Sequence, residues 1–149
     1  MVSAETHRIP IVGNESICLG WYPKDLGART AIFLHGLGSN RRGEKALHFA
    51  ECFNKQGWAF AALDLRGHGD SDGLMRDLTM SRMLADVHAT RLWLEARGVA
   101  ERPVLIGASM GAAVIAWYAL QHECEVDALI MIAPAPNENG NHPPRSRAQ

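Results

Sequence analysis

The sequence predicts an α/β fold in which an N-terminal β-hairpin leads into a mostly parallel sheet covered by helices on both faces. Short apolar runs that end in glycine alternate along the chain with longer segments whose apolar residues recur at helical spacing. The apolar runs are continuous rather than alternating with polar residues, which is typical of strands buried on both sides. Parallel strands joined by crossover helices satisfy both observations.

The first three strands are expected before residue 40. Residues 7–11 and 16–23 are short β-like runs, and the segment between them contains Gly13 and Asn14, which suit a tight turn. These two runs predict the hairpin. The apolar run "TAIFLHG" at 30–36 then predicts a buried strand that glycine ends.

A helix and a further buried strand are expected next. Residues 43–57 carry four apolar side chains on one side of a helix, and Gly57 supplies the C-terminal stop. These side chains are Ala46, Phe49, Ala50 and Phe53. The run "WAFAALDLRG" at 58–67 predicts the next strand of the sheet.

The second half of the chain repeats the alternation. Residues 79–98 have helical periodicity, with Thr79 as the N-cap and a glycine at the end. A strand at 103–109, a helix at 110–123 and a strand at 127–136 follow. The order of strand and helix predicts parallel neighbours.

Composition indicates one soluble domain, which we expect to span residues 1–136. The chain has 149 residues, of which 47% are hydrophobic and 21% charged, with a net charge of −1. Residues 137–149 have one apolar side chain, Ala148, and are expected to be a disordered tail. Scattered lysines and arginines argue against nucleic acid or an anionic membrane surface as partners. The spacing GxGxxxG at 67–73 excludes the GxGxxG pattern of dinucleotide-binding proteins.

The cysteines and the N-terminus favour a cytoplasmic location. Cys18, Cys52 and Cys124 are odd in number and widely spaced, so we expect buried free thiols rather than disulfides. The N-terminal residues lack the apolar segment of a secretion signal. His122 and Cys124 have no second pair of ligands nearby in sequence, so we expect no metal.

The uncharged segment 104–122 admits two interpretations. Its pentapeptide "GASMG" fits both the GxxxG packing motif of transmembrane helices and the GxSxG turn that presents a catalytic serine. A membrane span needs about 20 apolar residues, and the segment just reaches that length. However, β-favouring "PVLIG" changes to helix-favouring "AAVIAWYAL" within it. We therefore expect a strand-to-helix turn and no membrane span.

A serine at the tip of such a turn has special requirements. The residues two positions before and after it crowd together, and Gly107 and Gly111 remove the side chains that would clash around Ser109. The amide of Met110, at the start of the helix, is aimed where a carbonyl oxygen becomes negative during attack. The glycine-rich loop at 33–40 allows the amide of Leu37 to approach the same oxygen. Either motif alone is also compatible with a plain glycine-rich turn.

Three motifs together resemble one superfamily. "HGLGS" at 35–39, "DLRGHGDSDG" at 64–73 and "GASMGA" at 107–112 each follow an expected strand. In this order they resemble the α/β-hydrolase superfamily, and in particular the bacterial serine aminopeptidase and lysophospholipase-like esterases. The resemblance covers residues 8–136, which correspond to the N-terminal part of that fold.

The resemblance implies roles for individual residues. Ser109 matches the nucleophile, and the amides of Leu37 and Met110 match the oxyanion hole. His35 and His68 match positions that shape loops and do not transfer protons. The expected activity is hydrolysis of a small-molecule acyl ester without metal or organic cofactor.

The other triad members have poor candidates downstream of Ser109. Glu125 and Asp127 precede the last strand and His122 ends a helix, so all three should lie at the edge of the sheet opposite the serine. The remaining candidates are Glu123, Glu138 and His142. Of these, Glu138 and His142 lie on the expected tail, which is too irregular to hold a preorganised base.

We therefore expect an impaired enzyme. By the resemblance, the chain lacks the lid and the last strands, unless a partner chain completes it. The apolar strand "ALIMIA" at 128–133 would then be an open sheet edge, which invites pairing. The alternative function is a non-catalytic binding or assembly module, such as a homo-oligomer formed through this edge.

Overall fold

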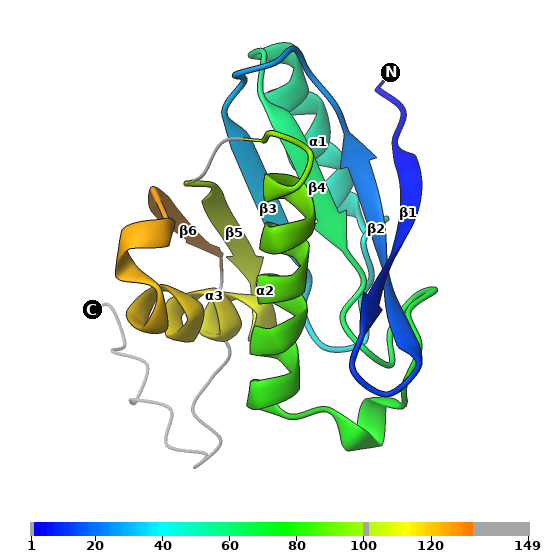
Figure 1. Cartoon of the computed structure of the whole chain (residues 1–149). Helices are drawn as coiled ribbons and strands as arrows, with labels where there is room; N and C mark the ends of the chain where they lie inside the picture. Colours follow the sequence, from blue (N-terminus) through cyan, green and yellow to red (C-terminus); the bar gives the residue numbers. More distant parts are fainter. Residues whose placement is uncertain (1, 100–101, 133–149) are drawn as a thin grey trace, which may run out of the picture.

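The computed structural model describes residues 2–99 and 102–132 and contains one six-stranded sheet in the order β1-β2-β4-β3-β5-β6 (Figure 1). The strands are β1 (Glu5–Ile11), β2 (Glu15–Tyr22), β3 (Thr30–Leu34), β4 (Ala59–Leu63), β5 (Val104–Ala108) and β6 (Ala128–Ile132). The helices are α1 (Glu44–Lys55), α2 (Met80–Glu95) and α3 (Met110–Gln121), with 3₁₀ turns η1 (Met75–Asp77) and η2 (Glu123–Glu125). The expected tail at 137–149, with Glu138 and His142, lies outside the described residues.

The N-terminal hairpin is confirmed. Strands β1 and β2 pair antiparallel with Ile9 opposite Ile17, and β2 pairs antiparallel with β4. Gly13 and Asn14 both have positive φ, 86° and 60°, as a tight turn between twisted strands requires. The hairpin therefore extends the parallel sheet on the side of β4.

The other four strands are parallel, and the chain winds around β3 in two directions. From β3 it passes through α1 to β4 on one side, and from β4 it crosses through α2 to β5 on the other side. Right-handed crossovers then place α1 on one face and α2 with α3 on the opposite face, as Figure 1 shows. The loops after β3 and β5 diverge toward different faces, and ligands bind at such switch points.

Two apolar clusters fill the layers on either side of the sheet. Ala46 and Ala50 of α1 pack with Phe33 and Phe60 on one face. The other cluster includes Tyr118 of α3 and the buried apolar side chains of α2. The prediction of helices on both faces is therefore confirmed.

Helix ends follow the expected local chemistry. The hydroxyl of Thr79 accepts a hydrogen bond from the amide of Arg82 at 3.2 Å and so caps α2. Gly57 and Gly98, just after α1 and α2, have φ of 83° and 73°. The turns η1 and η2 were not expected, because three-residue 3₁₀ turns carry no periodic pattern.

The cysteine expectation is wrong in part. Cys18 is buried on β2, but Cys52 and Cys124 are exposed. Cys52 lies on the outer side of α1 and Cys124 lies in η2, so neither faces an apolar cluster. All three thiols are free.

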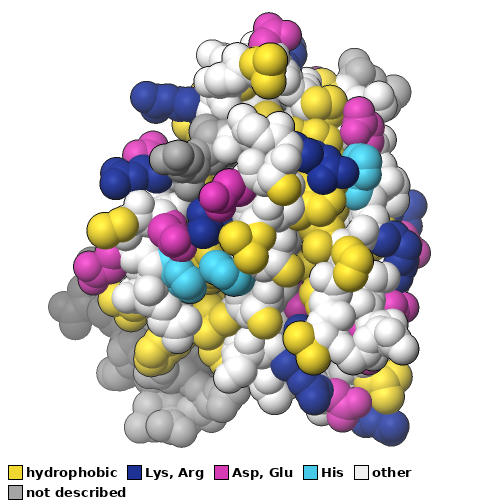
Figure 2. All heavy atoms as spheres, in the orientation of Figure 1, with side chains coloured by type: hydrophobic (Ala, Val, Ile, Leu, Met, Phe, Trp, Pro, Cys, Tyr) yellow, Lys and Arg dark blue, Asp and Glu magenta, His cyan; other side chains and the backbone are white. Residues whose placement is uncertain are grey.

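The segment 104–122 consists of strand β5, a one-residue turn at Ser109, helix α3 and the cap residue His122. None of the helices in the described ranges is both long and apolar enough to cross a membrane. Charged side chains of both signs are interspersed on the face shown in Figure 2. The expectation of a strand-to-helix turn is therefore confirmed.

Candidate functional site

Ser109 forms the sharp turn between β5 and α3. Its φ of 54° and ψ of −118° lie where an L-residue is strained, and its side chain is exposed. Its amide donates to the carbonyl of Ile132 at 2.9 Å, and its carbonyl accepts from the amide of Ala112 at 3.0 Å. The strand and the helix on either side thus hold the hydroxyl outward despite the strain.

Three glycines allow the backbones to meet around this turn. A Cβ on Gly107 would overlap the carbonyl of Gly111, and a Cβ on Gly111 would overlap the carbonyl of Leu34 on the neighbouring strand. A Cβ on Gly36 would lie 3.0 Å from the Cβ of Ser109. The crowding that the sequence predicted around Ser109 is therefore present.

Ser109 lies in a pocket of about 330 Å³ at the carboxyl ends of β3 and β5. The opposite wall is the loop after β3, where the amide of Ser39 donates to the carbonyl of Gly36 at 3.1 Å and Leu37 is exposed. Polar lining comes from Asn40 and from the first residues of α1. The turn and this loop therefore face one space that solvent can enter.

Two amides next to this turn and loop donate no hydrogen bond to a described residue. Leu37 lies on the loop after β3, and Met110 is the first residue of α3, whose first amides have no partner within the helix. Within residues 2–99 and 102–132, neither amide donates a backbone hydrogen bond. Both are available to an added oxygen atom.

His35 and His68 are committed to backbone groups. His35 Nε2 accepts from the amide of Leu65 at 3.0 Å, and its Nδ1 donates to the carbonyl of Gly36 at 2.7 Å. His68 Nε2 accepts from the amide of Gly38 at 3.0 Å. Burial lowers the pKa of His35 below its usual value, which favours the neutral ring that this bonding pattern needs. The two rings shape the loops after β3 and β4.

A buried carboxylate organises the loop after β4. Asp64 accepts from the amides of Arg41 at 2.6 Å and Asp70 at 2.9 Å and forms an ion pair with the Arg41 guanidinium. Arg41 also bonds Asp70 at 2.8 Å, which lowers the pKa of that exposed carboxyl. Gly69 has φ 51°, and a Cβ there would overlap the Asp64 carboxylate. The glycines and aspartates of "DLRGHGDSDG" therefore build this loop.

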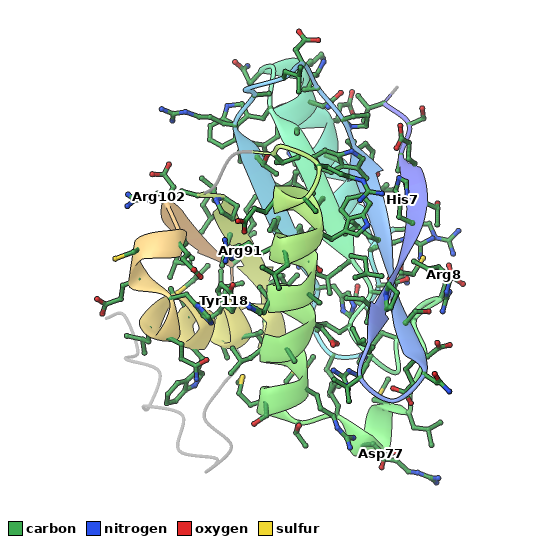
Figure 3. The ribbon with its side chains drawn as sticks, in the orientation of Figure 1. His7, Arg8, Asp77, Arg91, Arg102 and Tyr118 are labelled. Carbon is green, nitrogen blue, oxygen red and sulfur yellow. The ribbon has the colours of Figure 1, made fainter. Side chains whose placement is uncertain are left out.

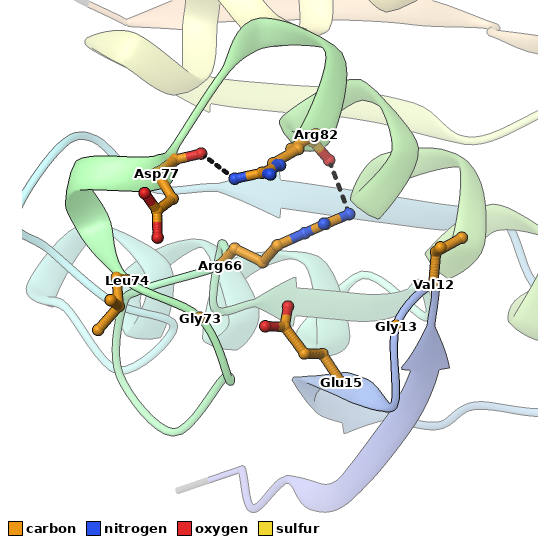
Figure 4. Close-up of a pocket in the computed structure, with 8 residues that line it drawn as sticks. All are labelled: Val12, Gly13, Glu15, Arg66, Gly73, Leu74, Asp77 and Arg82. Atoms are coloured by element: carbon orange, nitrogen blue, oxygen red, sulfur yellow. Dashed lines mark hydrogen bonds between the residues drawn. The ribbon is translucent and has the colours of Figure 1, made fainter.

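A second pocket, of about 440 Å³, lies between the hairpin turn and the loop that leads to α2 (Figure 4). Arg66 and Arg82 line it. The guanidinium of Arg66 bonds the buried carboxylate of Asp86 at 2.8 and 2.9 Å, and that of Arg82 donates to the carbonyl of Asp77. Burial raises the pKa of Asp86, and Arg66 opposes this shift. The lining residues of this pocket include no serine, threonine or cysteine.

The described carboxylates and histidine downstream of Ser109 lie away from its hydroxyl. Among the described residues, the hydroxyl of Ser109 has no hydrogen bond to a histidine or carboxylate. The amide of Asp127 donates to the carbonyl of Pro103, which precedes β5, so Asp127 lies at the opposite edge of the sheet. His122 and Glu125 lie at that same edge, at the end of α3.

Comparison with known proteins places this fold and site in a family. The profile described as "Serine aminopeptidase, S33" matches residues 28–148. The AB hydrolase superfamily protein YisY of Bacillus subtilis is 34% identical over 136 residues, covering 86% of this chain and 47% of the relative. Mouse palmitoyl-protein thioesterase ABHD10 is 35% identical over 105 residues, covering 70% of this chain and 34% of the relative.

A solved esterase structure has the same fold as this chain. The esterase Pf2001 of Pyrococcus furiosus superposes with a TM-score of 0.76 at 29% identity, covering 89% of this chain and 53% of that protein. The chain thus spans about half the length of this esterase and of YisY, and a third of the thioesterase. The chain belongs to the serine aminopeptidase S33 family of the α/β hydrolases.

Proposed function

We propose that the chain transfers acyl groups from small-molecule carboxylic esters to water, with Ser109 as the nucleophile and the amides of Leu37 and Met110 as the oxyanion hole. The observation that carries this proposal is a strained, exposed serine in a pocket whose opposite wall carries a free amide. Two similar proteins, a palmitoyl-protein thioesterase and an esterase, support the same reaction class.

The reaction would proceed in two steps. Ser109 Oγ adds to the carbonyl carbon of the ester, and its proton passes to a solvent water or hydroxide in the pocket as the new C–O bond forms. The carbonyl oxygen becomes negative, and each amide that donates to it stabilises the transition state by about 3 kcal/mol. The alcohol then leaves with a proton, and water hydrolyses the acyl-serine to the free acid.

Activation of Ser109 is the weak step of this scheme. A serine hydroxyl is a poor nucleophile without a base, and the described histidines near the pocket already bond to backbone groups. We propose that the 149-residue chain therefore has an incomplete triad and reacts slowly. The oxyanion hole and substrate binding alone accelerate such reactions by roughly 10³-fold over water.

A fluorophosphonate probe tests both parts of the proposal. We expect slow labelling of Ser109, identified by peptide mass spectrometry, that disappears in Ser109→Ala. The matched control is Ser39→Ala, which removes another hydroxyl from the same pocket and should leave labelling unchanged. Labelling that persists in Ser109→Ala would rule out this nucleophile. Rapid stoichiometric labelling of the wild type would show instead that the chain supplies a working base.

The open sheet edge favours a second candidate, an assembly module. Leu129, Ile130 and Met131 of β6 are 37–45% exposed, and β6 carries no charge or proline. The opposite edge strand, β1, carries Arg8 and Pro10, which discourage pairing. We expect light scattering after size exclusion to show a homo-oligomer that Ile130→Lys dissociates. A monomeric wild type at all concentrations would exclude this function.

The cytoplasmic location also remains a proposal. It rests on the free cysteines. The mouse relative carries "mitochondrial" in its name, which is a statement about that protein alone. Imaging of a fluorescent fusion in the source cells would distinguish the two compartments.

A further inference from the structure

A polar cluster lies between α2 and the end of α3, at the edge of the sheet opposite Ser109. Its members are His88 and Arg91 of α2, Tyr118 of α3, His122 at the C-cap of α3 and Glu125 of η2. Figure 3 shows Arg91 and Tyr118 close together between the two helices, and Figure 2 shows two adjacent histidine side chains on this face. The proposed hydrolase mechanism uses none of these residues.

Three potential metal ligands converge in this cluster. One ring nitrogen from each of His88 and His122 and one carboxylate oxygen of Glu125 all lie within 4.8 Å of one another. The two imidazole rings are stacked, with centroids 5.0 Å apart. Tetrahedral zinc with bonds of about 2.0–2.2 Å holds its ligand atoms roughly 3.4 Å apart. Binding one ion would therefore require the stacked imidazole rings to rotate, so that their ring nitrogens and the carboxylate oxygen reach that separation.

Glu125 Oε2 independently indicates a missing partner. This oxygen is buried and makes no hydrogen bond to any described residue. It lies 2.9 Å from His122 Nδ1, yet the angles of that contact do not meet those of a hydrogen bond. A buried acceptor without a donor destabilises the fold. A cation bound between Oε2 and the imidazoles would remove this destabilisation.

The neighbouring residues orient the ligands as partners of a metal site do. Tyr118 Oη lies 3.0 Å from His88 Nδ1 and accepts a hydrogen bond from Arg91 Nε at 3.2 Å. Arg91 Nη2 pairs with Glu125 Oε1 at 3.1 Å, so Oε2 is the oxygen on the side of His122. Hydroxyl and charged groups that fix imidazole and carboxylate ligands are a regular feature of zinc sites.

We propose that His88, His122 and Glu125 bind one zinc ion, with water as the fourth ligand. Two imidazoles and one carboxylate suit zinc, whereas calcium and magnesium prefer all-oxygen sites and copper(I) prefers sulfur. The ion would tie α2 to the end of α3 and to η2, so its effect is on stability. The sequence expectation of no metal considered only ligands close to His122 in sequence, and His88 belongs to a different helix.

Zinc titration of the chelator-stripped chain tests the site. We expect isothermal titration calorimetry to show one equivalent of zinc bound and the melting temperature to rise with added zinc. His88→Ala, His122→Ala and Glu125→Gln should each weaken binding at least tenfold and abolish the rise in melting temperature. The matched controls are His48→Ala and Cys124→Ser, which alter other exposed ligand types and should bind zinc like the wild type.

Cobalt(II) provides a readout in the unmodified chain, so the test does not depend on the variants folding. We expect the visible absorption of a four-coordinate site without a thiolate charge-transfer band. Absence of zinc and cobalt binding by the wild type would overturn the proposal. Equal loss in the control variants, or a thiolate band that Cys124→Ser removes, would also overturn the assignment of these three ligands.

Discussion

The loop after β4 and the turn after β5 meet at the same edge of the sheet but use their polar groups in opposite ways. In the loop, Asp64 and His68 are buried and fully bonded to neighbouring amides and to Arg41. In the turn, Ser109 is exposed, strained and without a side-chain partner among the described residues. Polar groups that are fully hydrogen-bonded stabilise the surrounding fold, whereas a polar group without a described partner can react.

Removing the charge of Asp64 should cause the largest loss in the free energy of unfolding. Asp64→Asn leaves the buried Arg41 guanidinium with only the exposed carboxylate of Asp70 as counter-ion, and breaking a buried pair costs about 3–5 kcal/mol. Urea unfolding measures the change in the free energy of unfolding. Asp77→Asn, an exposed aspartate whose carboxylate has no hydrogen bond among the described residues, is the control and should change it by less than about 0.5 kcal/mol. Equal effects of the two variants would contradict a structural role for the loop.

The second-largest loss of stability should come from filling the space beside the turn at Ser109. Gly111→Ala places a Cβ onto the carbonyl of Leu34, and such overpacking costs about 3 kcal/mol. Gly27 has a positive φ of 83° but lies in open space, so Gly27→Ala should cost only about 1 kcal/mol. If the two substitutions proved equal in thermal unfolding, close packing of β3 against the turn would not be the reason for glycine at 111.

The buried, hydrogen-bonded His35 should make the stability of the fold depend on pH. Burial lowers the pKa of His35, so below about pH 6.5 the unfolded chain binds a proton that the folded chain does not. Stability should therefore fall as pH drops below that value, by at most about 1.4 kcal/mol per pH unit for this group. The lowered pKa of half-buried His88 acts in the same direction. His35→Gln should flatten the dependence, and an unchanged slope would exclude His35 as a cause.

The smallest of these changes in stability should be a gain on replacing Ser109. Ser109→Gly relieves the positive φ and should stabilise the fold by about 1 kcal/mol while abolishing probe labelling. Ser109→Ala keeps the Cβ and should leave stability nearly unchanged. A loss of stability in Ser109→Gly would show that the turn is not strained.

Local patterns were enough to predict most of the fold. The apolar runs that became β3, β4 and β5 are short and end in glycine, and the helices between them have caps such as Thr79. The turn at Ser109 was predictable because two glycines and a change of propensity coincide there. These signals are local, so one sequence carries them.

Features that depend on residues far apart in the sequence could not be predicted from it. The exposure of Cys52 and Cys124 depends on how a helix and a 3₁₀ turn face solvent. The proximity of His88 to His122 depends on the packing of α2 against α3. Neither residue pair shares a short motif, so only the assembled structure brings these relationships out.

The pH dependence of phosphonylation at Ser109 tests the central claim most directly. If no imidazole activates this serine in the 149-residue chain, the labelling rate should rise steadily with hydroxide concentration from about pH 6 to pH 9, with no inflection near a histidine pKa of about 6.5. A rate that levels off above about pH 7 would reveal a histidine base and contradict the account.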